Sequence, residues 1–190
     1  MSSNKQNEIA LAAVKLFEQK GYRATSVQDI ADAVGLQKGS LYHYIASKED
    51  LLMQIAHQAI LQFNEQLEEI LAKEDTARGK LEQMIRTHLI MSIDNLETTT
   101  VLWREAFSLG EGPQEVIQGM TDKYLNLVAD ILRSGTETGE FNVTHPRITA
   151  LAILGACNWV YRWYHPSGTL TAEEIADIFS KLFLDGLLAH

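Results

Sequence analysis

The chain has 190 residues, of which 46% are hydrophobic and 22% charged, and its formal net charge is −9. This composition is too apolar for a disordered chain, and the acidic balance argues against indiscriminate binding to nucleic acid. No run of 18 apolar residues occurs and the start MSSNKQNEIA lacks the apolar segment of a signal peptide, so we expect a cytoplasmic protein of one or two domains with no membrane partner.

Charge is distributed unevenly along the chain. The first 50 residues hold six basic and six acidic side chains, so the remaining 140 residues carry the whole net charge. The N-terminal part is therefore electrostatically distinct from the rest.

Hydrophobic spacing and the scarcity of proline predict an all-α fold of about nine helices. The expected ranges are about 5–19, 26–34, 38–45, 48–72, 76–94, 98–109, 113–138, 146–164 and 171–188.

Helix start and stop residues support these ranges. We expect Thr25 to cap the second helix in the sequence TSVQ, with Gln28 completing a capping box. Glycine closes several helices in a left-handed conformation, as at Gly35, and Ser47 caps the fourth helix. Further start and stop signals stand at Gly21, Pro113, Gly139, Pro146 and Thr171.

Two short helices joined by a glycine turn and packed on a longer first helix make a helix-turn-helix unit. In such a unit the second short helix enters the major groove of DNA. Its segment KGSLYHY places Leu41 toward the core, so at least two of the three rings that follow face outward and the remaining one is free to pack. The predicted contacts to phosphates and base edges are Thr25, Ser26, Gln28, Lys38, Gly39, Ser40, Tyr42, His43, Tyr44 and Lys48.

The stretch TSVQDIADAVGLQKGSLYHYIASKEDLL resembles the DNA-binding domain of TetR-family transcriptional repressors, and the resemblance covers nearly all of residues 8–53. One departure is Gln37, where many members carry a serine or threonine cap. The resemblance implies a DNA-binding domain over residues 1–47 and a ligand-binding and dimerisation domain over 48–190.

The last two predicted helices are rich in apolar and small residues. The resemblance implies that they pair with the same helices of a second copy, so that a homodimer binds a palindromic operator. The expected interface residues are Ala152, Gly155, Ala156, Ile175, Ile178, Phe179, Leu182 and Phe183.

The resemblance also implies a cavity for a small-molecule effector. The candidate lining residues are Met84, His88, Met91, Trp103, Arg104, Phe107, Tyr124, Trp159, Arg162 and Trp163. For each of them, packing in the core is the alternative interpretation. Arg104 and Arg162 need partners in apolar helices, either a carboxylate such as Glu105 or an anionic group of the ligand.

The C-terminal segments GTETGEF and NWVYRWYHPSGTLTAEEIADIF resemble the TetR regulators that sense acyl-coenzyme A thioesters and control fatty-acid or sterol-ring degradation. This resemblance implies a repressor that binds DNA without ligand and is released by an acyl-coenzyme A. A multidrug-sensing repressor of efflux genes is the alternative, because an aromatic, methionine-bearing pocket also suits apolar cations.

No sequence feature favours an enzyme. The six histidines are scattered, and HExxH, CxxC, GxSxG and GxGxxG spacings do not occur, so no metal site or cofactor is expected. The single cysteine, Cys157, lies among apolar residues and is expected to be a buried, inert thiol.

Overall fold

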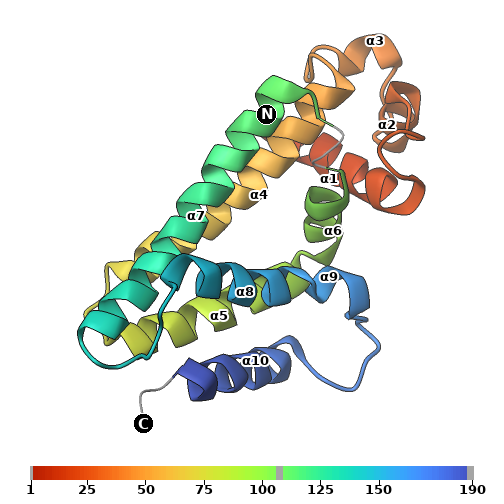
Figure 1. Ribbon diagram of the computed structural model, residues 1–190. Coiled ribbons are helices and arrows are strands. Elements are labelled where there is room, and N and C mark those ends of the chain that lie inside the picture. The colour runs from red at the N-terminus through yellow and green to blue at the C-terminus, as the bar shows by residue number, and fades with distance from the viewer. Residues whose placement is uncertain (1, 106–108, 188–190) are drawn as a thin grey trace. The chain divides into compact units, whose positions relative to one another are not determined.

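The computed structural model describes residues 2–105 and 109–187, and every regular element in these ranges is an α-helix (Figure 1). The helices are α1 (Ser2–Lys20), α2 (Val27–Ala33), α3 (Lys38–Leu41), α4 (Lys48–Leu71), α5 (Ala77–Asp94), α6 (Leu96–Glu105), α7 (Glu111–Glu137), α8 (Pro146–Asn158), α9 (Val160–Trp163) and α10 (Ala172–Leu187). The all-α prediction is confirmed. The helix predicted over 146–164 is divided into α8 and the single turn α9.

The chain forms two compact units. Residues 1–60 and 97–118 make up unit 1, and residues 61–96 and 119–190 make up unit 2. Helices α4 and α7 therefore each contribute residues to both units. The functional division after residue 47 stays a prediction.

Unit 1 contains the helix-turn-helix. Helix α1 packs against α2, and α2 packs against α3. Phe17, Ile30 and Leu41 are completely buried. Gly21 and Gly35 end α1 and α2 with φ values of 85° and 66°, in the left-handed region that the sequence predicted for Gly35.

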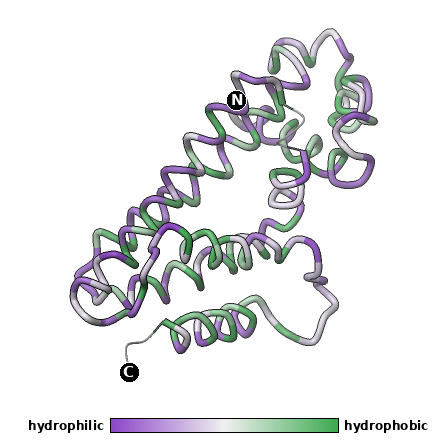
Figure 2. The backbone as a smooth tube through the Cα atoms, viewed as in Figure 1, coloured by the Kyte–Doolittle hydropathy of each residue, from purple (hydrophilic) through white to green (hydrophobic). Residues whose placement is uncertain are grey.

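Unit 2 is built around α5, which packs against α8, α9 and α10 (Figure 1). One cluster of buried side chains, contributed by α4, α5, α7, α8, α9, α10 and the loop after α7, forms its core. An ion pair between Arg86 and Asp177 also joins α5 to α10. Figure 2 shows long hydrophobic stretches along α8 and α10, as expected for helices with more than one apolar face.

Several predicted helix ends are confirmed. The hydroxyl of Ser47 accepts a hydrogen bond from the backbone N–H of Asp50 at the start of α4 (2.9 Å). Thr171 and Glu174 form a reciprocal capping box before α10. Pro146 occupies the first turn of α8, and Gly139 follows α7 with φ of 77°. Local sequence was therefore sufficient to place these ends.

The break between α8 and α9 lies at Trp159, although no glycine or proline stands there. The N–H of Trp159 bonds to the carbonyl of Gly155, and the N–H of Arg162 bonds back to Trp159. The preceding residue, Asn158, bonds through its side chain to His88 of α5. A tertiary contact thus lies directly at the point where the long predicted helix is interrupted.

Candidate nucleic-acid interface and effector site

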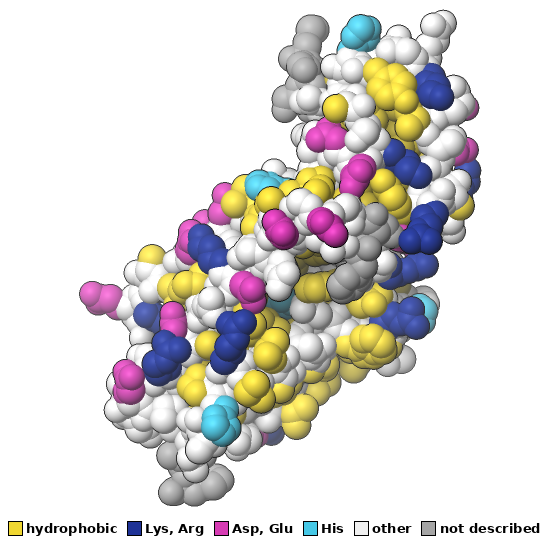
Figure 3. Space-filling view, turned by 45° about the horizontal axis from the view of Figure 1, so that its top comes forward, with side chains coloured by type: hydrophobic (Ala, Val, Ile, Leu, Met, Phe, Trp, Pro, Cys, Tyr) yellow, Lys and Arg dark blue, Asp and Glu magenta, His cyan; other side chains and the backbone are white. Residues whose placement is uncertain are grey.

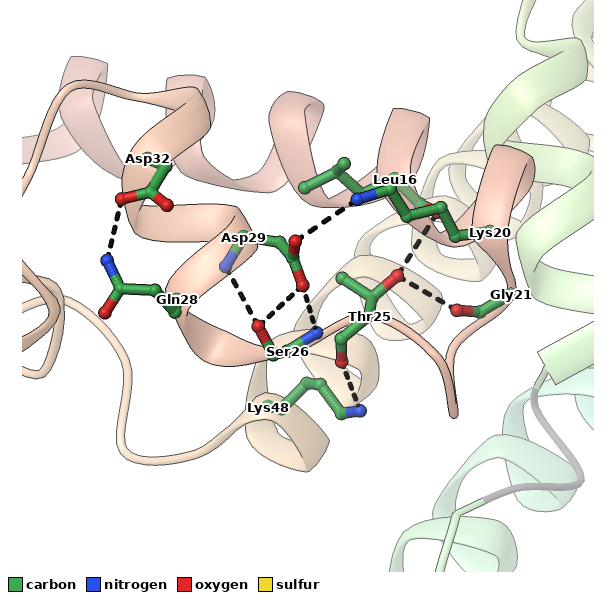
Figure 4. A network of polar contacts seen from close by, with 9 residues as sticks. All are labelled: Leu16, Lys20, Gly21, Thr25, Ser26, Gln28, Asp29, Asp32 and Lys48. Atoms are coloured by element: carbon green, nitrogen blue, oxygen red, sulfur yellow. Dashed lines mark hydrogen bonds and ion pairs between the residues drawn. The ribbon is translucent and has the colours of Figure 1, made fainter.

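Helix α2 is capped one residue later than predicted. The N-cap is Ser26, whose hydroxyl accepts from the backbone N–H of Asp29 (3.1 Å), and the Asp29 carboxylate accepts from the Ser26 N–H (2.7 Å). The prediction that Thr25 and Gln28 form this capping box is therefore wrong. Gln28 instead donates from its side chain to Asp32 (2.7 Å; Figure 4).

The negatively charged carboxylate of Asp29 lies at the N-terminus of α2. The hydrogen bond from the Ser26 side chain, followed by those from the Ser26 backbone and Lys20, lowers the pKa of Asp29 to about 2. The carboxylate of Asp29 thus takes the place next to the helix dipole where a DNA phosphate was predicted. A phosphate bound there would face this negative charge, which argues against Ser26 as its ligand.

Thr25 has an internal role. Only 1% of its surface is exposed, and its hydroxyl lies 2.9 Å from the carbonyl oxygen of Gly21 and 3.3 Å from that of Leu16 (Figure 4). The hydroxyl thus ties the loop before α2 to the end of α1. A phosphate contact from the Thr25 hydroxyl is inconsistent with this burial.

Lys48 is also engaged within the protein. Its ammonium donates to the carbonyl oxygens of Tyr22 (2.7 Å) and Thr25 (2.6 Å) and lies 4.3 Å from the centre of the Tyr22 ring. Burial lowers the pKa of Lys48. With two of its three donors used on backbone carbonyls, Lys48 joins α4 to the loop before α2, and its predicted contact to a phosphate stays a prediction.

The predicted DNA-contacting residues of α3 and the turn after it lie at the protein surface. Lys38, Gly39, Tyr42 and His43 are exposed, and Ser40 is half-buried. Tyr44 is half-buried as well, so it is the ring of the three that packs, as the sequence left open.

Leu41 and Ile45 are buried and hold this surface on the core, as predicted. Helix α3 itself ends at Leu41 and continues as turns, which is shorter than the predicted range, and its N-cap Gln37 makes no side-chain hydrogen bond. The remaining DNA contacts on α3 stay predictions.

A polar triad lies inside unit 2, in which two side chains are buried and the third is half-buried. His88 of α5 places Nδ1 3.0 Å from the hydroxyl of Tyr124 of α7 and Nε2 2.8 Å from Oδ1 of Asn158 at the end of α8. Because an amide oxygen only accepts, Nε2 carries the proton and Nδ1 accepts from Tyr124. The Phe63 ring of α4 lies 4.9 Å from the imidazole, between centroids.

The triad is uncharged near neutral pH. Burial lowers the pKa of His88 to about 4 despite the opposing effect of the bond to Asn158, and burial raises that of Tyr124. Both ring nitrogens of His88 therefore have hydrogen-bond partners within the protein.

The predicted effector residues are divided between the two units. Met84, His88 and Tyr124 are buried in unit 2, and Met91 is half-buried. Trp159, Arg162 and Trp163 are exposed around α9. Trp103 and Arg104 belong to α6 in unit 1, whereas Phe107 lies outside the described residues.

Neither arginine of the prediction forms an ion pair within residues 2–105 and 109–187. Arg162 instead lies over the ring of Trp159, 5.6 Å from its centre. The expected alternative of a salt bridge to Glu105 is not what the described residues show. An exposed guanidinium next to an exposed indole leaves Arg162 available for an anionic ligand group.

Sequence reasoning missed Phe63 and Asn158. The signal for Asn158 was present, because it is an amide within the apolar segment ILGACNWV and a buried amide requires a hydrogen-bond partner. Phe63 gave no comparable signal, since an aromatic residue in an amphipathic helix is ordinarily part of a core.

Helices α8 and α10 each expose an apolar strip. On α8 it consists of Ile148, Leu151, Ala152 and Gly155, continued by Trp159, and on α10 it consists of Ile178 and Leu182. Ala152, Gly155, Ile178 and Leu182 were predicted as interface residues, whereas Ile148 and Leu151 were missed. Exposed apolar strips of this kind mark association surfaces.

The other predicted interface residues are buried or half-buried within the protomer. Ile175 is buried in the core of unit 2, which argues against its assignment to the interface. Ala156 is half-buried, and Phe179 and Phe183 are half-buried against the same core. Ile175 precedes Leu182 by two helical turns on nearly the same side of α10, so helix periodicity alone could not separate them.

Cys157 is buried in unit 2 as expected, and burial raises the pKa of its thiol to about 12. In the described part of the chain no helix is long and apolar enough to cross a bilayer, and no group of three or more His, Cys, Asp or Glu side chains could hold a metal ion.

On the face drawn in Figure 3, several Lys and Arg side chains follow one another along the right edge, and acidic and apolar side chains lie between and beside them. Binding to DNA through such a surface depends on a few well-placed contacts rather than on a general positive field.

Comparison with known proteins agrees with this geometry. Residues 9–55 match the family model "Bacterial regulatory proteins, tetR family", and residues 74–187 match "Tetracyclin repressor-like, C-terminal domain". The HTH-type transcriptional repressor KstR2 of Rhodococcus jostii is 29% identical over 97% of this chain and 92% of its own length. The fatty acid metabolism regulator protein of Bacillus subtilis is 32% identical over 72% of this chain and 70% of its own.

Among solved structures, AibR in complex with isovaleryl coenzyme A and operator DNA is 27% identical, with a TM-score of 0.86 over 93% of this chain and 96% of that one. The family matches together cover both the helix-turn-helix and the C-terminal helices. The chain belongs to the TetR family of bacterial transcriptional regulators.

Proposed function

We propose that this chain represses transcription by binding a palindromic operator as a homodimer and that an acyl-coenzyme A thioester releases it. The observation that carries the DNA-binding part is the exposed surface of Lys38, Gly39, Tyr42 and His43, held by the buried Leu41. These residues supply one cation, a close approach of the backbone, and rings with polar groups for base edges.

The homodimer rests on the exposed apolar strips of α8 and α10 in a chain whose family matches extend over both helices. A second copy covers both strips by twofold symmetry, and the symmetry of the dimer requires two half-sites in the operator.

The acyl-coenzyme A proposal combines two observations about this chain with two about its relatives. The aromatic side chains of Phe63 and Tyr124 around the neutral His88 suit an acyl group, and the exposed Arg162 suits an anionic group of the same ligand. The relatives include a regulator of fatty acid metabolism and a complex with isovaleryl coenzyme A.

The alternative of a cation-sensing drug regulator requires a carboxylate in an apolar site. No aspartate or glutamate is among the buried polar residues of the described chain. A desolvated cation needs a compensating charge, and the side chains described in contact with His88, which are Phe63, Tyr124 and Asn158, carry none.

A direct test starts from a duplex selected from random DNA with the unmodified protein. Fluorescence anisotropy then measures retention of that duplex while acyl-coenzyme A esters of increasing chain length, free coenzyme A and cationic dyes are added. We expect release by at least one thioester and by neither control. Release by the dyes alone would refute the effector proposal, and failure to select any duplex would refute the DNA-binding proposal.

A further inference from the structure

Two adjacent residues at the start of α4 form hydrogen bonds to different parts of unit 1. Lys48 donates to the carbonyl oxygens of Tyr22 and Thr25, in the loop that leads into α2. The next residue, Glu49, accepts a hydrogen bond from the backbone N–H of Gly110 (2.7 Å). The first turn of α4 is therefore bonded both to the helix-turn-helix and to the residue that precedes α7.

The carboxylate of Glu49 in α4 caps the N-terminus of a different helix, α7. Gly110 directly precedes Glu111, the first residue of α7, so the carboxylate lies at the positive end of the α7 dipole. The approach is close, because a Cβ atom built on Gly110 would lie only 3.1 Å from the same carboxylate oxygen. Glu49 also raises the pKa of Tyr22, after the larger effect of burial, which places its charge near the ring that Lys48 covers.

Both helices joined by Glu49 continue to residues of the candidate effector site. Helix α7 runs without interruption from Glu111 to Glu137 and carries Tyr124, and helix α4 carries Phe63. A displacement of α7 along its axis would act on Gly110 first and, through Glu49, on the first turn of α4. Lys48 would pass the same displacement to the loop that positions α2.

We propose that Lys48 and Glu49 are positioning residues that together couple the start of α7 to the helix-turn-helix, and that the Glu49–Gly110 bond carries the effector response to the DNA-binding surface. This inference rests on the proposed function, whose effector and operator it uses.

The test compares Glu49→Ala with Glu49→Gln. The amide oxygen of glutamine can still accept from Gly110, so it preserves the bond without the charge. Glu115→Ala is the matched control, because it removes an exposed carboxylate from the first turns of α7. The readout is the ratio of operator affinities without and with isovaleryl-coenzyme A or the most effective longer acyl-coenzyme A.

We expect Glu49→Ala to reduce that ratio about fivefold or more while Glu49→Gln and Glu115→Ala keep it, since coupling free energies of regulators correspond to factors of about 5 to 150. A Glu49→Ala variant that is released as fully as the unmodified protein would overturn the proposal. Loss of the response in Glu115→Ala to the same extent would overturn it as well.

Hydrogen exchange of the DNA-free protein separates this inference from the proposed function. We expect Glu49→Ala to speed amide exchange over residues 110–115 and also over 22–28, with no change in α10. If the unmodified protein binds no duplex, the proposed function is refuted, and the hydrogen-exchange rates alone test the coupling. Faster exchange in both segments of Glu49→Ala would support the coupling, and unchanged exchange over residues 22–28 would refute it.

Discussion

Replacing Leu182 with glutamate tests the assembly of the protein most directly. Leu182 is 65% exposed on α10, and Leu11 on α1 is 62% exposed, so the two leucines are matched in accessibility but lie on different units. If the strip on α10 is covered by a second copy, Leu182→Glu disrupts the dimer and Leu11→Glu does not.

The expected magnitude follows from the exposed fraction. Complete burial of a leucine side chain contributes about 1.5–3 kcal/mol, so covering the exposed 65% contributes about 1–2 kcal/mol in each protomer. Twofold symmetry doubles this to about 2–4 kcal/mol, which raises the dimer dissociation constant about 30- to 1,000-fold. Desolvation of the two introduced carboxylates adds to the effect.

Sedimentation velocity over a dilution series measures the dissociation constant for the unmodified protein and both variants. Circular dichroism checks that the helical content is retained. A dissociation constant for Leu182→Glu within about threefold of the unmodified value, which is below 1 kcal/mol, would refute the assignment of α10 to the interface. An equal loss of dimer in Leu11→Glu would show that the effect is not specific to the strip.

Three further predictions concern single side chains. Lys38→Met should reduce the steepness of log affinity against log salt concentration by about 0.9 per protomer. Lys48→Met should leave that slope unchanged and should lower the free energy of unfolding by about 1 kcal/mol. Anisotropy titrations at several salt concentrations measure the slope, and urea denaturation measures the free energy of unfolding. Thr25→Val should cost about 1 kcal/mol of stability through its lost hydroxyl bonds without changing the salt slope, and an unchanged urea midpoint would contradict its internal role. The pKa of His88 is about 4 in the folded protein and 6.5 in the unfolded chain, so the unfolded chain takes up the proton first as the pH falls. The free energy of unfolding should therefore drop by about 2 kcal/mol between pH 8 and pH 5. Urea denaturation of His88→Gln should show a correspondingly smaller drop.

Features determined by neighbouring residues were predictable from the sequence. The caps at Ser47 and Thr171, the proline at the start of α8 and the glycine that closes α2 each depend on a few consecutive residues. The buried Leu41 and Ile45 followed from helical spacing in the same way. These features were sufficient to predict the helix-turn-helix and to orient α3.

Features determined by tertiary contacts were not predictable. TSVQ and SVQD both fit a capping box, and only the carbonyls at the end of α1 decide that Thr25 turns inward and Ser26 caps. The hydrogen bonds from Lys48 to the carbonyls of Tyr22 and Thr25 could not be predicted either, because they join residues more than 20 positions apart. The sequence showed that the last helix is rich in apolar residues, but it could not say which of them its own protomer covers.

Because Cys157 is buried, a cysteine introduced at the surface can be labelled selectively for distance measurements. A thiol whose pKa is raised to about 12 is almost entirely protonated in neutral buffer and therefore reacts slowly with maleimides and spin-label reagents. Since it is the single cysteine, a new one introduced at the exposed His43 would take nearly all of the label without removal of the native residue. Pairs of such labels in a dimer would report the separation of the two α3 helices with and without a thioester.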